Sequence, residues 1–454
     1  MSLTSFLSIA RSAMVTHQRA MDVTAHNVAN AQTPGYSRQR LDLAAAVPLL
    51  TPGGAIGRGV TAEGISRARD QFFDSAFRRE SGLLGTSTTL RDFLGRVEAA
   101  INEPSDTGLA SALDGLFGSF ADLAADPTNP VARGQVAQKA NSLIQQFHRL
   151  DATITAAMQD VTSQLSAQVS EANGLARQIA DLNTRLLSAG GSGGSADLAD
   201  QRDVAIDRLS QLGAVRVLER NDGTVGVLFG DAMLVDGGLA NTLTVVPAGG
   251  GGVGVGLAGG GAVDPQAGSL KALNDLSTTT LPGIRAQLDA LAQGLVMEVN
   301  AVHQTGYNAL GATGVDFFDP AGTTAATIGL SVSVQASPDA IATGAGNAPG
   351  DAAVALQLSQ LGGTAVPSLS GRTLRDFYID LASAVGTAVS DANQNASTQQ
   401  TLVDRADAQR SSVSGVSIDE EMVTLIGQQH AFGAAARLVQ VASEMMDDVL
   451  QMVR

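Results

Sequence analysis

Apolar residues recur every three or four positions along the first thirty residues of this 454-residue chain. The steps alternate between four and three from Leu3 to Val28, which is a heptad repeat over nearly four heptads. The series consists of Leu3, Leu7, Ala10, Met14, His17, Met21, Thr24 and Val28, widened by Phe6, Ile9, Ala13 and Ala20. The stripe is broader than a two-stranded seam, so we expect this helix to be contacted on more than one side.

The C-terminal segment carries a stripe of the same kind. Ser417 followed by Glu420 is a capping box, and the acidic Asp419 and Glu420 favour a helix start. The stripe that follows consists of Leu425, Gln428, Phe432, Ala435, Val439, Ala442, Met446, Val449 and Val453. Two interpretations stay open on periodicity alone: two unrelated amphipathic helices, or terminal helices that pair with each other and with neighbouring subunits. The breadth of both stripes favours the second.

Between the two ends, further patterns with steps of three and four predict long helices. Residues 67–101 fit one helix, weakened near Gly82 and Gly85, and residues 109–125 fit a shorter one. A helix of about 55 residues follows and ends at the Gly-rich stretch 188–196, and residues 374–406 predict another. Helices of this length pack as antiparallel pairs in bundles.

Two stretches have a different pattern. Residues 214–247 alternate apolar and polar positions and contain Asn-Asp-Gly and Asp-Gly-Gly turns, which predicts β-hairpins. Residues 326–344 predict more strand and loop. The fold class predicted is mainly α with a β-rich insertion: paired N- and C-terminal coiled-coil helices, a long-helix bundle and a small outer β domain.

These patterns divide the chain into three parts. The predicted parts are a terminal helical stem (1–42 and 412–454), a helical bundle domain (43–210, 268–310 and 368–411) and a β-rich outer domain (211–267 and 311–367).

The first predicted helix ends abruptly before Thr33-Pro34-Gly35-Tyr36. Pro34 disfavours the α region for Thr33, and Pro-Gly suits the centre of a type II turn. Asn30 is a suitable residue for a helix end. After the turn, Tyr36 and Arg38 are consistent with a subunit contact and equally with a packed aromatic beside a surface cation.

The stretch "HNVANAQTPGYSRQR" resembles the signature of the bacterial flagellar axial proteins, the family of rod, hook and junction subunits. Tyr-Ser-Arg-Gln after the Pro-Gly resembles the hook-associated junction subunits in particular. Segments 198–212, 268–320 and 414–450 also resemble these subunits. The residues that match the signature turn are Asn27, Asn30, Thr33, Pro34, Gly35 and Tyr36.

This resemblance implies a structural adaptor and not an enzyme. It implies terminal helices that line a central channel, export by the flagellar type III apparatus, and a place outside the cell at the hook–filament junction. The partners implied are identical subunits in a ring, the hook protein, a second junction protein (hook-associated protein 3), and a cytoplasmic export chaperone that covers the C-terminal helix. Another axial subunit, a hook or rod protein, is the alternative.

The residues expected to bury against neighbouring stems lie on the two terminal stripes. They are Leu3, Leu7, Ala10, Met14, Met21, Val28, Leu425, Phe432, Val439, Met446 and Val449. Because isolated helices are marginal in water, we expect the stem to be frayed before assembly.

Composition narrows the remaining possibilities. A net charge of −16 argues against a nucleic-acid partner, and the absence of cysteine excludes disulfides and thiolate metal sites. Aromatic residues make up only 4% of the chain, which favours long helices packed through small side chains. No apolar run reaches the ~20 residues that cross a bilayer, so no membrane insertion is predicted.

Candidate chemistry is sparse. The histidines are scattered without metal-ligand spacing, at positions 17, 26, 148, 303 and 430. We expect His17 to be a packed neutral side chain. "GVGLAG" (254–259) matches GxGxxG formally, but no predicted helix follows it. No catalytic residue, cofactor or metal is predicted.

Overall fold

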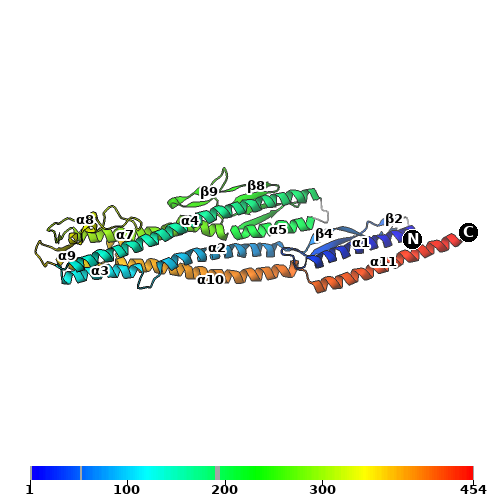
Figure 1. Cartoon of the computed structure of the whole chain (residues 1–454). Coiled ribbons are helices and arrows are strands. Elements are labelled where there is room, and N and C mark those ends of the chain that lie inside the picture. The colour runs from blue at the N-terminus through cyan, green and yellow to red at the C-terminus, as the bar shows by residue number, and fades with distance from the viewer. Residues whose placement is uncertain (1–2, 52–53, 190–194, 453–454) are drawn as a thin grey trace.

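The computed structural model describes residues 3–51, 54–189 and 195–452. The molecule is an elongated, mainly helical rod with both chain ends at the same tip (Figure 1). Helices α1 (Leu3–Asn30) and α11 (Ile418–Met452) pack side by side at that tip. We call these two helices the stem and the longer part formed by residues 68–414 the body.

Long helices build the body. They are α2 (Gln71–Ile101), α3 (Leu109–Ala125), α4 (Pro130–Ala189), α5 (Ser195–Leu212), α6 (Gly268–Asp275), α7 (Leu281–His303) and α10 (Leu374–Ser414). A π-helical turn, Leu276–Thr280, joins α6 to α7. The apolar stripe of α4 faces the other helices, and its Phe147, Val161 and Leu165 are fully buried. The predicted helix over 109–125 is confirmed, and the predicted helix of about 55 residues is α4, with 60 residues.

Helix α2 continues through Gly82 and Gly85, where the sequence predicts a weakening. The two glycines serve close packing instead. A Cβ on Gly85 would lie 2.5 Å from the carbonyl oxygen of Gln211, and one on Gly82 would lie 3.1 Å from that of Ser210. The missing side chains therefore let the end of α5 rest directly on α2.

The hairpins predicted over 214–247 are present. Strands β5 (Val215–Glu219), β6 (Val225–Phe229), β7 (Ala232–Asp236) and β8 (Leu239–Ala240) form an antiparallel sheet in that order, followed by the hairpin of β9 (Leu243–Pro247) and β10 (Val253–Leu257). They lie along α4 (Figure 1). Asn173 of α4 donates a hydrogen bond to the carbonyl of Leu243 and accepts one from its amide. Asn183 donates to the carbonyls of Val225 and Gly237 and accepts from the amide of Val225.

Residues 311–367 correct the prediction of a β-rich segment. Their regular elements are mainly the short helices α8 (Val332–Ala336) and α9 (Ala353–Gln360) with several 3₁₀ turns, and β12 (Ala342–Gly344) pairs only with β11 (Tyr307–Asn308). Helices α8 and α9 lie at the end of the body furthest from the stem, whereas β8 and β9 lie on the half nearer the stem (Figure 1). The two segments predicted to form one outer domain therefore lie on different parts of the body.

The physical reason is that side chains of α7 hold an irregular backbone in place. Asn300 accepts hydrogen bonds from the amides of Phe317 and Phe318 and donates to the carbonyl of Phe318. The two phenylalanines are fully buried, so this loop packs without regular strands.

Residues 43–67 also differ from the prediction, which placed them in the bundle domain. Strands β1 (Gln39–Ala45) and β4 (Val60–Arg67) pair antiparallel and pack against α1, with β2 (Leu49–Thr51) and β3 (Gly54–Ile56) at their tip. They form an arm alongside the stem, because they pack mainly against α1, and Arg67 at the end of β4 also binds α5.

Candidate assembly interface

The two stem helices meet along a seam of small side chains. Ala10 and Ala20 of α1 are buried, as are Ala435 and Ala442 of α11. His17 crosses the same seam, and its Nδ1 lies 2.6 Å from Oε1 of Gln428. The polar members of the two stripes thus pair with each other, and His17 is a packed side chain as predicted.

The seam uses much of both predicted stripes within one chain. Ala10 is buried, Met446 and Val449 are 41% and 48% exposed, and the side chain of Leu3 lies outside the described part of the chain. The other predicted assembly residues are half-buried: Leu7, Met14, Met21, Val28, Leu425, Phe432 and Val439. The structure therefore brings these residues together inside the subunit, and their contact with neighbours stays a prediction.

A second apolar series on α11 is more exposed and was not among the predicted stripes. Its members are Met422, Val423, Ile426, Leu438, Val441, Met445, Leu450 and Met452, with exposed fractions between 43% and 85%. Steps of three and four link several of them beside the first stripe, and that spacing was the available signal. The α11 helix thus carries apolar residues on two sides, and α1 covers only one of these sides.

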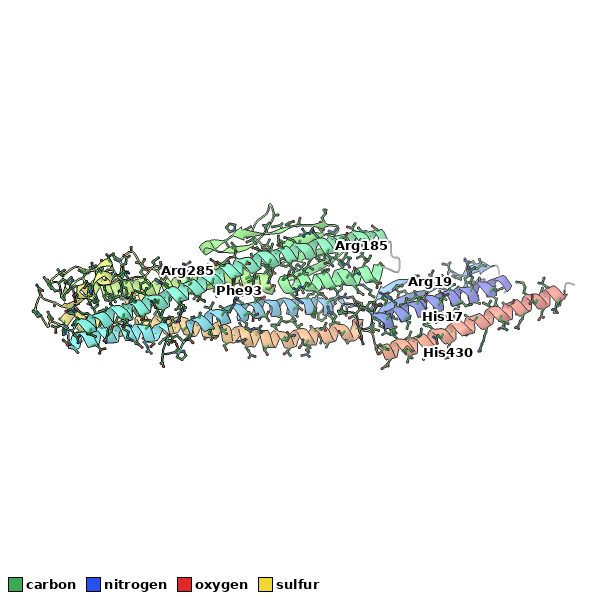
Figure 2. All side chains as sticks on the ribbon, viewed as in Figure 1. His17, Arg19, Phe93, Arg185, Arg285 and His430 are labelled. Carbon is green, nitrogen blue, oxygen red and sulfur yellow. The ribbon has the colours of Figure 1, made fainter. Side chains whose placement is uncertain are left out.

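A groove runs along the side of α1 that faces the arm. Its volume is about 620 Å³, and it is lined by Leu7, Ser8, Arg11, Ser12, Val15, Thr16 and Arg19 of α1 and by Val60, Thr61 and Ala62 of β4. Figure 2 labels His17 between α1 and α11 and Arg19 on the other side of α1.

The type II turn predicted at Pro34-Gly35 is present. The amide of Tyr36 donates to the carbonyl of Thr33 at 3.2 Å, and Gly35 has φ +79°, as position i+2 of a type II turn requires. Glycine is needed for a second reason, because a Cβ at position 35 would lie 2.2 Å from Cγ2 of Val204 on α5. Asn30 closes the preceding helix by donating to the carbonyl of His26.

Asn27 joins three separate segments. Its amide nitrogen donates to the carbonyl of Gln39 (2.9 Å) and to Oε2 of Glu421 (3.0 Å). Its amide oxygen accepts from the hydroxyl of Tyr36 (2.8 Å) and from the amide of Gln39 (2.9 Å). The buried side chain therefore fixes the turn, the start of β1 and α11 together through both its donor and its acceptor atoms.

Tyr36 and Arg38 are both engaged within the chain. Arg38 binds Glu421, which is 2% exposed, at 2.7 Å and Glu420 at 3.1 Å. Burial and the neighbouring Asp197, Asp200 and Glu421 raise the pKa of Tyr36, so its hydroxyl stays protonated and donates to Asn27. In the single chain, Tyr36 and Arg38 are therefore packed within the subunit, and a role in a subunit contact stays a prediction.

One face of α5 carries a ladder of aspartates that anchors the stem to the body. We call Asp197, Asp200, Asp203 and Asp207 the α5 ladder. Asp200 accepts from the amide and hydroxyl of Ser37, just after the turn, and Asp197 from the side chain of Gln39. The spacing of three, three and four was readable in the sequence, but the distant partners were not.

Four arginines from three regions of the chain complete the ladder. Arg67 binds Asp200 and Asp203, Arg69 binds Asp203 and Asp74, Arg78 binds Asp203 and Asp207, and Arg410 binds Asp207. The end of β4, the start of α2 and the end of α10 are thereby held to α5.

The ladder shifts the charge equilibria of its central members. Burial alone would raise the pKa of Asp203, but Arg69, Arg67 and Arg78 outweigh it and lower that pKa. Burial alone would lower the pKa of Arg69, but Asp203 and Asp74 outweigh it and raise it. Both groups therefore stay charged, as a buried network with satisfied partners requires.

Residues 3–51, 54–189 and 195–452 contain no cluster of three or more His, Asp or Glu side chains that could hold a metal ion. Within the same ranges no helix is long and apolar enough to cross a membrane.

Comparison with known proteins shows which protein family has this architecture. Residues 94–318 match the family described as the flagellar hook-associated protein FlgK helical domain. The flagellar hook-associated protein 1 of Bacillus subtilis is 29% identical over 506 aligned residues, which cover 98% of this chain and 97% of that relative. The chain belongs to the flagellar hook-associated protein 1 family. Its members are structural components of the bacterial flagellum, at the junction between hook and filament.

Other comparisons agree with membership of the hook-associated protein 1 family. The Salmonella typhimurium and Escherichia coli relatives are 30% and 28% identical over 332 residues. These alignments cover 70% of this chain but only 59% and 60% of those relatives. The flagellar hook junction protein FlgK from Burkholderia pseudomallei has the same fold, with a TM-score of 0.66 at 18% identity, covering 76% of this chain and 100% of that one.

The ends of the chain match more general flagellar families. Residues 7–36 match the flagella basal body rod protein family, and residues 408–452 match the C-terminal family of the flagellar basal body rod FlgEFG proteins. The hook-associated protein 1 similarity spans the body as well, so the alternative of a hook or rod subunit is not favoured. Assembly with other flagellar axial proteins follows from this membership.

Proposed function

We propose that this chain is an adaptor subunit that forms a ring of identical copies between the hook and the filament, outside the cell. The observation that carries the proposal is the apolar outer face of α11, where Val423 is 72% and Val441 46% exposed. Apolar area buried between proteins contributes about 25 cal/mol per Å², so a few hundred Å² per subunit gives a gross gain of several kcal/mol. This gain is available only when a neighbour covers the face.

The same observation suggests different roles for the stem and the body. In this proposal residues 1–42 and 412–454 form a coiled-coil stem that lines the central channel, and the body stands outside it. The signature residues Asn27, Asn30, Thr33, Pro34, Gly35 and Tyr36 set the angle between the two parts. The predicted stripe residues then contribute to assembly by shaping the stem.

The partners proposed are the hook protein on one side and hook-associated protein 3 on the other. Before export by the flagellar type III apparatus, a cytoplasmic chaperone covers α11. Support for a chaperone comes from the chemistry of this helix, whose exposed methionines and aliphatic side chains need cover in the cytoplasm. No catalytic activity is proposed.

Removal of residues 415–454 tests this function. The expected result is a body that stays folded, seen as helical circular dichroism and a cooperative transition, together with loss of incorporation into flagella and loss of chaperone capture in a pull-down. The full-length chain in the same cells is the control. Normal filaments grown with the truncated chain would disprove the adaptor role, and a collapsed body would disprove the division into stem and body.

A further inference from the structure

The end of α11 has no cover from the described part of the chain. Ala442 is fully buried against the seam, but the side chains of residues 443–452 are all exposed. We call residues 443–452 the overhang, because α11 extends beyond α1 at the shared tip (Figure 1). At 1.5 Å per residue the overhang is about 15 Å long.

The overhang combines apolar and acidic side chains. Met445, Val449 and Leu450 are 50%, 48% and 62% exposed. Asp447 and Asp448 lie among them and have no cationic partner in the described part of the chain. No Lys or Arg occurs in residues 443–452. A partner surface must therefore offer both apolar contacts and positive charge.

The groove on α1 offers both. Its lining includes Leu7 and Val15, the latter 44% exposed, and the cations Arg11 and Arg19. Among the residues that the structure describes, no acidic residue lines it and neither arginine has a carboxylate partner. From Leu7 to Arg19 the groove extends along α1 for about 18 Å, a length similar to that of the overhang.

The groove and the seam lie on opposite sides of α1. With 100° per residue, Ala10 and His17 share the face toward α11, whereas Val15 and Arg19 point about 140° to 180° away. The α11 helix of the same chain occupies the first face, so its overhang does not reach the groove on the second. The occupant must come from another molecule.

We propose that the overhang of one copy docks in the α1 groove of a second copy. This inference rests on the ring proposed above and names the surfaces that build it. The contact joins two different surfaces, so it is heterologous, and repeated contacts of this kind produce a ring or a helical tube and not a closed pair. The unpaired arginines of the groove then meet the unpaired aspartates of the overhang.

Cysteine cross-linking tests the pairing directly, because the natural chain contains no cysteine. One tagged copy carries Val15→Cys and a second, differently tagged copy carries Leu450→Cys, and both are expressed in cells that lack the natural chain. After mild oxidation of isolated hooks and filaments, we expect a mixed dimer and neither homodimer. A Ser170→Cys copy on the exposed surface of α4 is the matched control and should not cross-link to position 450.

Charge reversal tests the electrostatic part. Arg11→Glu with Arg19→Glu, and separately Asp447→Lys with Asp448→Lys, should each lower the ratio of incorporated to secreted protein at least tenfold. The two pairs of substitutions combined should restore this ratio to within about threefold of the natural chain. Asp391→Lys with Asp404→Lys, two exposed acids on α10, makes the matched control and should leave the ratio unchanged.

The outcomes separate the two proposals. Homodimers through position 450, or no mixed dimer in flagella that incorporate both copies, would overturn the overhang–groove contact and leave the adaptor function standing. Failure of the combined charge variant to recover, while the mixed dimer still forms, would overturn the pairing of Arg11 and Arg19 with the two aspartates. Absence of the natural chain from the junction would overturn the adaptor function itself.

Discussion

The body and the stem differ in how far they bury their apolar side chains. In the body, the stripe of α4 is covered along most of its length, and residues such as Phe147 and Leu165 are fully buried. In the stem, α11 has one covered face and one exposed face with Val423 and Met445. The body therefore buries its apolar stripes within the single chain, whereas the stem leaves one face of α11 exposed, and we propose that neighbours cover this face. Similar 3-4 patterns in the sequence thus lead to nearly complete burial in one region and to partial burial in the other.

The largest expected difference comes from matched truncations in the two regions. Phe147→Ala should lower the free energy of unfolding by about 3–5 kcal/mol, because it removes a fully buried ring from the body. Met446→Ala in the stem should change it by less than about 0.5 kcal/mol, because that side chain is 41% exposed. Urea denaturation followed by circular dichroism measures both, and equal effects would contradict the comparison.

Asn27→Ala should have the next largest effect and should act on the stem alone. It leaves the buried carboxylate of Glu421 without one of its donors and Tyr36 without its acceptor, at a cost of about 2–3 kcal/mol. Hydrogen exchange should speed up in α1 and α11 while the body keeps its protection. Gln18→Ala, at an exposed position of α1, is the control. Unchanged exchange in α11 would mean that Asn27 does not hold the stem together.

A smaller effect is expected from acid at the boundary between stem and body. The arginines around Asp203 hold its folded pKa below that of an unfolded aspartate, about 3.9. The contribution of Asp203 to stability is therefore present above about pH 4 and is lost as the pH falls through the lowered folded pKa. Denaturation curves between pH 7 and pH 2.5 should show this loss, and Asp203→Asn should weaken the pH dependence. If the variant and the natural chain have the same pH dependence of stability, the acid sensitivity does not arise from Asp203.

The smallest effect on the isolated chain is expected from polar substitutions in the exposed end of α11. Met445→Ser with Leu450→Ser should change the free energy of unfolding by less than about 0.5 kcal/mol, because both side chains are at least half exposed. The same variant should fail to enter flagella, because assembly alone covers these residues. Normal motility with this variant would show that the exposed face of α11 is not an interface.

Periodicity was sufficient to predict the covered helices. The stripes of α3 and α4 predicted both elements, because their apolar faces pack on neighbours of the same kind. The Pro34-Gly35 turn was equally predictable, since its geometry depends on local backbone preferences. Residues 311–367 were not predictable in this way, because Asn300 and His303 on α7 decide their backbone path.

Prediction of the interface from the sequence has the same limit. The heptad positions indicated which faces of the terminal helices are apolar, but not which face the seam takes up. The α5 ladder escaped prediction because the arginines that pair with Asp203 and Asp207 lie more than a hundred residues away along the chain. Contacts between segments so far apart depend on the tertiary fold and leave no local pattern.

The bond between His17 and Gln428 joins positions 411 residues apart, and the bond between Asn27 and Glu421 joins positions 394 apart. A chain synthesised from its N-terminus consequently holds α1 without its companion until α11 has been made, nearly 400 residues later. A product that stops before α11 lacks the helix that covers the seam face of α1, so Ala10 and Ala20 lose that cover.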